Sequence, residues 1–452
     1  MMPFSGKIFH FPGGVRLHDG KSLSASEPIR EAPLLERYFT AVQQNIGKPP
    51  RLIVAKGEHV LKGQRIAEPD GMVSSPLHSP ASGTVGNIVL VPGAARPMVQ
   101  AVEIISDGKD EPGTGLEPIP DWRNTDREVL RRRIGDAGVV GMGGAAFPTQ
   151  VKLLVPPQKD MDTLIVNGAE CEPYLTADHR IMLERAEDVL EGAAIVAKIL
   201  HVSRIFVGIE ENKPDAIRTM EAAAEPYGAE IVPLPARYPQ GGEKQLIYAV
   251  TGRHVAAGGL PMDVGCVVQN VGTCVAVRDA VAEGQSVIER YVTITGTPVR
   301  CPGTWKLRIG TPVSEALKMA GGIVKPVAKV ILGGPMMGFS QSSLDVTVTK
   351  NTSGILLLQK SETGQYAAGP CIRCGRCVDA CPMRLQPGPI SVMLEAGRLD
   401  QAEQAFVSDC VECGACAYVC PAKRPLVQHF RRAKAEINMK RRAALLKNKR
   451  RP

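Results

Sequence analysis

The sequence lacks any long apolar run. No stretch of its 452 residues approaches the roughly 18–20 consecutive apolar residues that a membrane-spanning helix needs. Residues 1–14 also lack the continuous apolar core of a secretory signal peptide. Aromatic residues make up only 4% of the chain, but 44% hydrophobic residues is ordinary for a globular protein. We therefore expect a soluble, multidomain chain in a reducing cytoplasm.

Acidic residues are scarce at the C-terminal end. Between residues 423 and 452 there are twelve Lys or Arg residues and one acid, Glu436, so the formal net charge of +8 is concentrated there. Such a segment is compatible with nucleic acid, an anionic membrane surface, an acidic partner subunit or a solvated helix end. No aromatic platform or groove-reading motif accompanies the charge, so we expect no nucleic-acid partner.

Cysteine, in contrast, is concentrated in two runs near the C-terminus. Both have the form C-x2-C-x2-C-x3-C-P, the spacing of proteins with two cubane clusters, in which the fourth cysteine of each run binds the other cluster. The predicted ligands of one [4Fe–4S] cluster are Cys371, Cys374, Cys377 and Cys420, and those of the second are Cys410, Cys413, Cys416 and Cys381. Structural zinc uses separated cysteine pairs, and disulfides need an oxidising compartment, so neither explains these runs as well.

The N-terminal part of the chain predicts β-structure. Residues 1–30 hold a turn-forming run without visible chemistry. Residues 31–115 contain short candidate strands and many turns, a pattern that resembles the barrel-sandwich (lipoyl-like) domains that carry a cofactor on a lysine at a hairpin tip. The expected tip at residues 71–76 has no lysine, so we interpret this barrel as a docking or structural module.

The remaining segments predict three further modules. Candidate strands alternate with helices over residues 121–287, including a long helix at 177–200, which predicts a doubly wound, largely parallel α/β domain. Residues 288–345 predict a β-grasp module, residues 360–430 a helical two-cluster ferredoxin domain, and residues 431–452 a basic tail. The predicted fold class is a multidomain α/β plus β protein.

A glycine-rich stretch at residues 138–152 is the second chemical signal. Dense glycines let the backbone approach a ligand and turn its N–H groups toward phosphate, and Lys152 adds a positive charge. The stretch follows a helical pattern rather than a strand, so it is not a dinucleotide fingerprint. Taken alone, it is equally consistent with a tight structural turn.

Three more stretches favour a binding site. Residues 167–173 follow a strand, at the edge where open α/β sheets bind ligands, and carry two carboxylates that can accept hydrogen bonds from ribityl and ribose hydroxyls. Residues 238–244 pair glycines with an acid, and residues 268–273 add amide and hydroxyl groups after an apolar run. The four stretches together indicate a nucleotide-like ligand.

In order along the chain, these four stretches resemble the flavin and nicotinamide site of the NADH-binding flavoprotein subunit of respiratory complex I. With the barrel, β-grasp and ferredoxin segments, nearly the whole chain resembles the RnfC family, the C subunits of Rnf (Rsx) ion-translocating electron transport complexes. The resemblance implies that FMN lies against Gly141, Gly143, Gly144, Lys152, Asn167, Glu170, Gly241, Asn270 and Thr273, and that Phe147, Glu172 and Glu243 face NAD(H). The chain departs from the family pattern at Met142, Ala146, Gly242 and Gln269.

The resemblance also implies a function. Electrons would be exchanged with NAD(H) through FMN and relayed singly through two [4Fe–4S] clusters. The subunit would be peripheral, on the cytoplasmic side of the inner membrane, with integral membrane subunits and a ferredoxin-like iron–sulfur subunit as partners. We predict no catalytic side chain, because the hydride chemistry belongs to the cofactors. Two alternatives stay open: an electron-conducting scaffold without an NADH site, and a soluble flavo-iron–sulfur corrinoid reductase.

Overall fold

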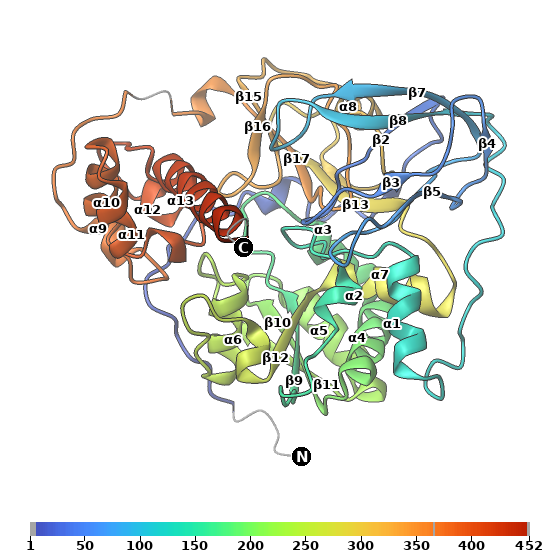
Figure 1. Ribbon diagram of the computed structural model, residues 1–452, viewed down its shortest axis with the longest axis horizontal. Helices are drawn as coiled ribbons and strands as arrows, with labels where there is room; N and C mark the ends of the chain where they lie inside the picture. The colour runs from blue at the N-terminus through green and yellow to red at the C-terminus, as the bar shows by residue number, and fades with distance from the viewer. Residues whose placement is uncertain (1–5, 365–366, 450–452) are drawn as a thin grey trace.

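The computed structural model describes residues 6–364 and 367–449. In the view of Figure 1, the α/β sheet and its helices lie below, the barrel and β-grasp strands lie above them, and helices α9–α12 form a group at the left. In the described ranges, none of the helices is long and apolar enough to cross a bilayer. Residues 1–5 of the predicted N-terminal segment, 365–366 of the predicted ferredoxin domain and 450–452 of the predicted tail lie outside the described residues.

The N-terminal barrel consists of two small sheets packed face to face. One has the strand order β2-β8-β7-β4, formed by Arg37–Ala41, Val99–Ser106, Gly83–Val91 and His59–Val60. The other has the order β3-β5-β6, formed by Arg51–Leu52, Arg65–Glu68 and Leu77–His78. Tyr38, Ile66 and Ile104 are fully buried in the shared core. Burying the apolar face of each small sheet against the other holds the module together.

The segment between β5 and β6, which includes the predicted hairpin tip, contacts the α/β domain. The buried Lys350 Nζ donates to the carbonyl oxygens of Gly138 at 2.6 Å and Pro76 at 2.8 Å, and Ser75 Oγ donates to the same Gly138 oxygen at 3.3 Å. Burial lowers the pKa of Lys350 to about 7. The barrel is therefore fastened to the residue where the glycine-rich stretch begins.

The α/β domain is built on a four-stranded parallel sheet. Its order is β11-β10-β9-β12, formed by Ala229–Leu234, Arg204–Glu210, Thr163–Gly168 and Cys266–Asn270. Helix α6 (Glu243–Thr251) covers one face. The other face is covered by α1 (Arg127–Asp136), α4 (Ala186–Leu200), α5 (Pro214–Ala224) and α7 (Val271–Ala282). Helices on both faces make the sheet doubly wound, as predicted.

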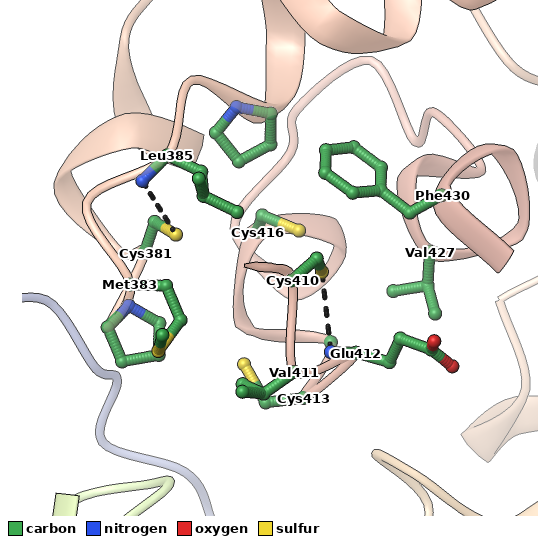
Figure 2. Close-up of a pocket in the computed structure, with 13 residues that line it drawn as sticks. Cys381, Met383, Leu385, Cys410, Val411, Glu412, Cys413, Cys416, Val427 and Phe430 are labelled. Atoms are coloured by element: carbon green, nitrogen blue, oxygen red, sulfur yellow. Dashed lines mark hydrogen bonds between the residues drawn. The ribbon is translucent and has the colours of Figure 1, made fainter. Parts of the chain in front are cut away.

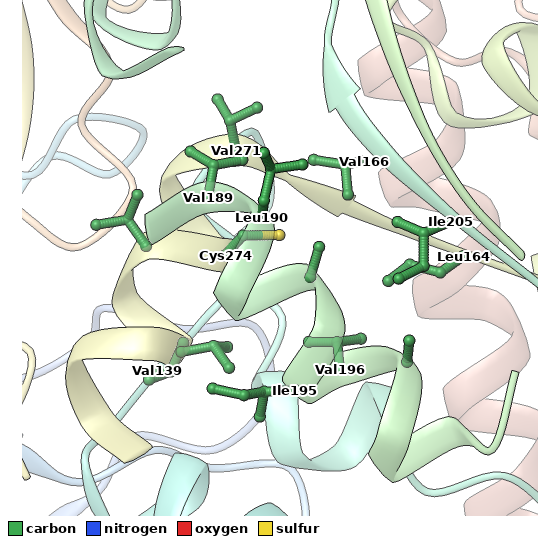
Figure 3. Packing of buried hydrophobic residues seen from close by; sticks show 14 of the residues in the cluster. Val139, Leu164, Val166, Val189, Leu190, Ile195, Val196, Ile205, Val271 and Cys274 are labelled. Carbon is green, nitrogen blue, oxygen red and sulfur yellow. The ribbon is translucent and has the colours of Figure 1, made fainter. Parts of the chain in front are cut away.

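Helices α4 and α7 pack very closely on the larger core (Figure 3). A Cβ atom at Gly192 would stand 1.9 Å from the carbonyl oxygen of Cys274, so only glycine permits this approach. Val189 and Val196 fill the space on either side and are fully buried. Without Gly192 the two helices would have to separate, which would open the core beneath the sheet.

The single helix predicted over residues 177–200 is wrong, because the chain breaks at Arg185 between α3 (Ala177–Glu184) and α4. The Arg185 backbone has φ −135° and ψ 37°, outside the helical region. Its guanidinium group donates to Asp188 at 2.6 Å, Asp279 at 2.8 Å and Tyr291 Oη at 2.8 Å. Two of these partners, Asp279 and Tyr291, are far away in the sequence, so they hold a break that the hydrophobic periodicity does not reveal.

The β-grasp module is a mixed sheet around one helix, α8 (Val313–Met319). Its order is β1-β14-β13-β17-β15-β16, formed by Arg30–Glu31, Gly303–Arg308, Glu289–Thr295, Gly354–Leu358, Lys329–Leu332 and Phe339–Gln341. The first long strand, β13, lies in the middle and pairs in parallel with β17. The sheet thus takes in β17, which lies beyond residue 345, and borrows β1 from the N-terminal segment.

The C-terminal part is helical. Two short helices, α9 (Arg376–Asp379) and α12 (Ala415–Tyr418), lie inside the cysteine runs, and α10 (Pro387–Glu395) and α11 (Leu399–Gln404) lie between the runs. The long helix α13 (Leu426–Lys449) starts inside this core, where Phe430, Ala433 and Ile437 are buried. The predicted basic tail therefore continues a helix of the ferredoxin core.

Candidate functional site

The carboxyl ends of β9 and β12 meet where the strand order of the α/β sheet reverses. The two strands are neighbours in the sheet although β10 and β11 separate them along the chain, and Asn167 pairs in register with Asn270 at their ends. Doubly wound sheets bind nucleotides in the crevice at such a switch point. The structure therefore brings together two predicted site residues from distant parts of the sequence.

The glycine-rich loop closes onto the first turn of α7. The Gly141 N–H group donates to the Phe147 carbonyl oxygen at 2.9 Å, which folds the loop back on itself. The Met142 N–H group donates to Thr273 Oγ1, also at 2.9 Å. These two hydrogen bonds hold the loop that contains Gly141 against the first turn of α7, which contains Thr273. Both are predicted flavin-binding residues.

Close packing between the loop and the helix cap depends on glycine. Asn270 caps α7, since its Oδ1 accepts from the N–H groups of Gly272 at 2.9 Å and Thr273 at 3.3 Å. A Cβ atom on Gly143 would stand 2.9 Å from Asn270 Cβ, whereas one on Gly144 would meet nothing within 4 Å. The backbone at Gly144 is thus open to a ligand, beside a capped helix N-terminus.

The carboxylate of Glu170 holds the start of α3. Its two oxygens accept from the N–H groups of Asp178 at 2.7 Å and His179 at 3.2 Å. Lys21 Nζ lies 3.8 Å from the carboxylate and donates to the Glu170 carbonyl oxygen at 2.9 Å. The residue itself has a left-handed φ of 44°. Glu170 therefore lies in the turn after β9 with its carboxylate already hydrogen-bonded.

Glu172 reaches the β-grasp module instead of the glycine loop. Its carboxylate oxygens accept from the N–H groups of Met336 at 3.0 Å and Met337 at 2.8 Å, in the turn between β15 and β16. Burial raises the pKa of Glu172 to about 7, and the two N–H groups partly oppose that rise. Both oxygens of this predicted nicotinamide-facing carboxylate are committed to that turn.

Two contacts bring the remaining predicted residues together. Lys152 Nζ, at the end of α2 (Thr149–Lys152), lies 2.8 Å from Glu243 Oε1 at the start of α6, and both side chains are partly exposed. Asn167 Nδ2 donates to the Gly241 carbonyl oxygen at 2.9 Å. The 238–244 loop therefore closes over the end of β9.

Three buried side chains at this site carry donors without a partner in the described part of the chain. They are Gln240 Nε2, Gln269 Nε2, and the Nε and Nη1 atoms of Arg290. Each residue is 2% exposed. Buried donors normally find acceptors, so the unmatched donors beside the loop, the cap and the strand ends fit a bound group rich in carbonyl and phosphate oxygens, as FMN is.

Sequence reasoning missed Asp178 and Arg290. Asp178 Oδ2 accepts from Asn270 Nδ2 at 2.6 Å, and burial, followed by the nearby Glu170, raises the pKa of Asp178. A signal for Arg290 was available, because it alternates with Val292 and Ile294 on the buried face of β13. A charged residue in the hydrophobic phase of a strand marks a site that needs an explanation.

Four of the predicted cluster cysteines surround one cavity (Figure 2). Cys381, Cys410, Cys413 and Cys416 line it, together with apolar side chains that include Leu385, Val427 and Phe430. Backbone N–H groups approach two of the sulfur atoms: Leu385 donates to Cys381 Sγ and Glu412 to Cys410 Sγ, both at 3.3 Å. Such N–H donors stabilise the more negatively charged reduced form of an iron–sulfur cluster and so raise its reduction potential.

The other predicted set lies nearer the surface, although Cys420 is buried. Burial raises the pKa of Cys377, and the neighbouring thiols of Cys420 and Cys371 raise it further, so these three lie together. Cys374, in the same loop, is exposed. In the described residues, no three Cys, His, Asp or Glu side chains converge on a single metal ion. A cubane instead takes one thiolate at each of its four irons.

The loop that carries Cys413 touches the 238–244 loop of the predicted flavin site. Tyr238 Oη, from the 238–244 loop, donates to the Cys413 carbonyl oxygen at 2.6 Å and is buried. A Cβ on Gly414 would stand 3.0 Å from the Met336 carbonyl oxygen, in the turn that Glu172 holds. One hydrogen bond and one close backbone contact therefore join the α/β, β-grasp and ferredoxin modules.

Four family models match parts of this sequence. They are the RnfC barrel sandwich hybrid domain at residues 9–109, the Nuo51 FMN-binding domain at 134–279, the SLBB domain at 291–340 and a 4Fe-4S dicluster domain at 365–439. These matches follow the predicted order of modules and, with the observed sheets and helices, confirm the predicted fold class.

Relatives match over nearly the whole chain. The C subunit of the proton-translocating ferredoxin:NAD(+) oxidoreductase complex of Clostridium ljungdahlii is 48% identical, covering 94% of this chain and 93% of that protein. The C subunit of the Na(+)-translocating complex of Acetobacterium woodii is 43% identical, covering 96% and 98%. The C subunit of the ion-translocating oxidoreductase complex of Pseudomonas aeruginosa is 46% identical over 96% of this chain, which spans 56% of that longer protein.

Solved structures show the same fold in a more distant protein. Crystal structures of an NAD+-reducing [NiFe]-hydrogenase in its H2-reduced and air-oxidized states superpose with TM-scores of 0.51 and 0.52 at 19% and 20% identity. The matches cover 71% of this chain and 64% and 65% of the hydrogenase chains.

Proposed function

The chain belongs to the RnfC family, the C subunits of Rnf-type ion-translocating oxidoreductases, and we propose that it is the subunit through which such a complex exchanges electrons with NAD(H). It is an oxidoreductase subunit with FMN and [4Fe–4S] clusters as cofactors, so the resemblance identified from its motifs is confirmed.

One contact carries the proposal, the hydrogen bond from Tyr238 to the Cys413 carbonyl oxygen. It joins the loop that closes the flavin side of the α/β domain to the loop that holds a cluster ligand. A continuous chain of packed atoms between two redox groups is what single-electron transfer needs. An unrelated binding module fused to a ferredoxin would have no reason to bury this contact.

The residues that would hold FMN surround the switch point. They are Gly141, Gly143, Gly144, Lys152, Asn167, Glu170, Gly241, Asn270 and Thr273. The buried donors without a partner at the switch point support FMN binding there. Bound there, FMN supplies the exchange between a two-electron hydride and single electrons. The chain's own part would be to offer loop N–H groups to the phosphate and to cover the site with the 238–244 loop.

Nicotinamide binding rests on fewer groups. We place Phe147 and Glu243 toward NAD(H), where the exposed Lys152–Glu243 pair can open to take a ribose or a phosphate. Glu172 would act indirectly, through the β15–β16 turn, because both of its carboxylate oxygens accept hydrogen bonds from that turn. The wall that it stabilises would set the width of the nicotinamide cleft.

The two clusters occupy different places on the route. The cluster of Cys381, Cys410, Cys413 and Cys416 is nearer the flavin, because its loop contacts Tyr238. The cluster of Cys371, Cys374, Cys377 and Cys420 is the outer one, because Cys374 and its neighbour Ile372 are exposed. Electrons would leave through this outer cluster, one at a time.

The acceptor would be another subunit of the complex. Relatives of this chain are named as subunits of multi-subunit assemblies. We place the chain as a peripheral subunit on the cytoplasmic side of the inner membrane, against integral membrane subunits and a ferredoxin-like iron–sulfur subunit. The basic helix α13 is compatible with an anionic membrane surface or an acidic partner.

Anaerobic purification followed by addition of NADH tests the proposal. We expect about one FMN and eight iron atoms per chain, since two cubanes carry four irons each, and we expect NADH to bleach the flavin and then reduce the clusters. Iron and flavin content, flavin absorbance and the electron paramagnetic resonance of the clusters are the measurements. Glu243→Gln should weaken NADH binding while leaving the flavin bound.

Each alternative gives a different outcome. A chain that binds flavin and iron but that NADH does not bleach would be an electron-conducting scaffold. A chain that stays in the soluble fraction of native cells and reduces a corrinoid would be a soluble reductase. Either result would contradict the role in NAD(H) exchange within a membrane complex.

A further inference from the structure

Arg290 contributes a buried guanidinium group to the flavin site from outside the α/β domain. It lies on β13 of the β-grasp sheet and is 2% exposed. Its Nη2 donates to the Met142 carbonyl oxygen at 2.7 Å, inside the glycine-rich loop. Its Nη1 would lie 3.0 Å from a Cβ atom on Gly272, so the group reaches the first turn of α7.

Arg290 has no direct ion-pair partner in the described part of the chain, and its Nε and Nη1 atoms have no hydrogen-bond partner there. Burial lowers the pKa of Arg290, and Asp178 and Glu170 oppose that effect from a distance. Neither carboxylate is hydrogen-bonded to Arg290, since Asp178 accepts from Asn270 and Glu170 from the start of α3.

The surroundings favour an anion next to Arg290. The N-terminus of the twelve-residue helix α7 adds a second positive end to the buried guanidinium. A cavity of about 50 Å³ opens beside Met142, Gly272 and Arg290. The acids on its other walls are neutralised, since Asp279 pairs with Arg185 at 2.8 Å and Glu289 with Lys306 at 2.9 Å. Buried donors without an acceptor are costly, and an anion bound to Arg290 would accept from them.

We propose that Arg290 binds a phosphate group, the phosphate of the bound flavin, so that the β-grasp module completes the flavin site. This rests on the proposed function, since it takes FMN to be the resident cofactor. Nη2 fixes the glycine loop through Met142, while Nη1 and Nε are free to donate to phosphate oxygens. Arginine suits this task because its fork of donors can bind two oxygens at once.

The test compares FMN with riboflavin, which lacks the phosphate. Apo-protein is titrated with each flavin, and binding is measured by quenching of flavin fluorescence. Arg290→Gln should weaken FMN binding by about 10- to 100-fold, the range for a lost charged hydrogen bond, and change riboflavin binding by less than about threefold. Inorganic phosphate should compete with FMN in the wild type and leave riboflavin binding unchanged.

Arg308→Gln is the matched control. Arg308 is an arginine of the same sheet, on β14, but its guanidinium is paired with Asp110 at 2.5 and 2.7 Å and contacts the barrel. This variant should keep the wild-type preference for FMN over riboflavin. Arg290→Lys keeps the charge without the fork and should retain part of the preference, which keeps the test valid if Arg290→Gln does not fold.

The other outcomes overturn the inference in distinct ways. Equal weakening of FMN and riboflavin would make Arg290 a purely structural support of the glycine loop. Phosphate that binds together with FMN, and does so through Arg290, would make this a separate anion site. A wild-type chain that binds neither flavin would overturn the proposed function itself, and with it the proposed binding of the flavin phosphate by Arg290.

Discussion

The two cysteine loops share one backbone and differ in what surrounds them. In each loop the residue two positions after the first cysteine has a left-handed φ, 56° at Arg373 and 58° at Glu412. A glycine then follows the second cysteine, with φ 77° at Gly375 and 83° at Gly414. A Cβ on Gly375 would meet nothing within 4 Å, whereas one on Gly414 would meet Met336.

The difference in environment separates roles that the identical spacing cannot distinguish. The loop of Cys410, Cys413 and Cys416, here the inner loop, is packed against Tyr238 and the β15–β16 turn, and Cys413 is 8% exposed. In the loop of Cys371, Cys374 and Cys377, here the outer loop, Cys374 is exposed and Ile372 is 64% exposed. Spacing therefore predicts the cluster type, and the neighbouring domains are the basis for the proposed position of each cluster on the route. Paired substitutions at equivalent positions of the two loops can test this difference.

Loss of one cysteine from each loop should have the largest effect. Cys413→Ser should abolish the inner cluster, so NADH would still bleach the flavin but its delivery of electrons to the outer cluster would fall by about tenfold or more. Cys374→Ser should abolish only the outer cluster and leave the inner one reducible. Iron content and electron paramagnetic resonance after NADH addition measure both. Equal loss of inner-cluster reduction in the two variants would refute the assigned order.

Glu172→Gln should change the pH dependence of stability. The pKa of Glu172 is raised to about 7, above the value near 4.3 expected in an unfolded chain, so its contribution is greatest at low pH and is lost as the pH rises through about 7. The variant has no such titration, so its free energy of unfolding should rise relative to that of the wild type by up to roughly 3 kcal/mol from pH 5 to pH 8.

Thermal unfolding of both proteins across this pH range is the measurement for Glu172. The exposed Glu117→Gln is the control and should follow the wild type at every pH. A constant difference between Glu172→Gln and the wild type from pH 5 to pH 8 would show that this carboxyl group does not titrate in that window.

Tyr238→Phe removes the hydrogen bond that joins the inner loop to the flavin side. We expect the free energy of unfolding to fall by about 1–2 kcal/mol, because the Cys413 carbonyl oxygen loses its buried donor. NADH-dependent reduction of the inner cluster should slow as well. Tyr418→Phe, at an exposed tyrosine within the same cysteine run, should change neither quantity. Identical behaviour of the two variants would remove Tyr238 from the proposed route.

Much of the site could be predicted from the sequence because it depends on local rules. Asn167 and Asn270 each lie at the carboxyl end of a strand of a parallel sheet, so both are expected at one edge. Lys21 could not be found this way, since it enters the site from an element far away in the sequence. Arg290 is marked in the sequence only by its place in the hydrophobic phase of β13, which does not say which site it reaches. The break at Arg185 was missed for the same reason, because its partners Asp279 and Tyr291 are supplied by tertiary packing.

The smallest expected effect concerns the equivalent charges at Glu412 and Arg373. Glu412 lies 2.9 Å from Arg431 and 2.5 Å from Lys434, so α13 is held against the inner loop by ion pairs with its own basic side chains. Glu412→Gln should lower the free energy of unfolding by roughly 0.5–1 kcal/mol, and high salt should reduce that difference because it screens the pairs. Arg373→Gln, in the exposed loop, should have no measurable effect. Chemical denaturation at low and high salt is the measurement. If Arg373→Gln costs as much as Glu412→Gln, the two loops are equally tied to the rest of the molecule, and the distinction between an inner and an outer cluster fails at this position.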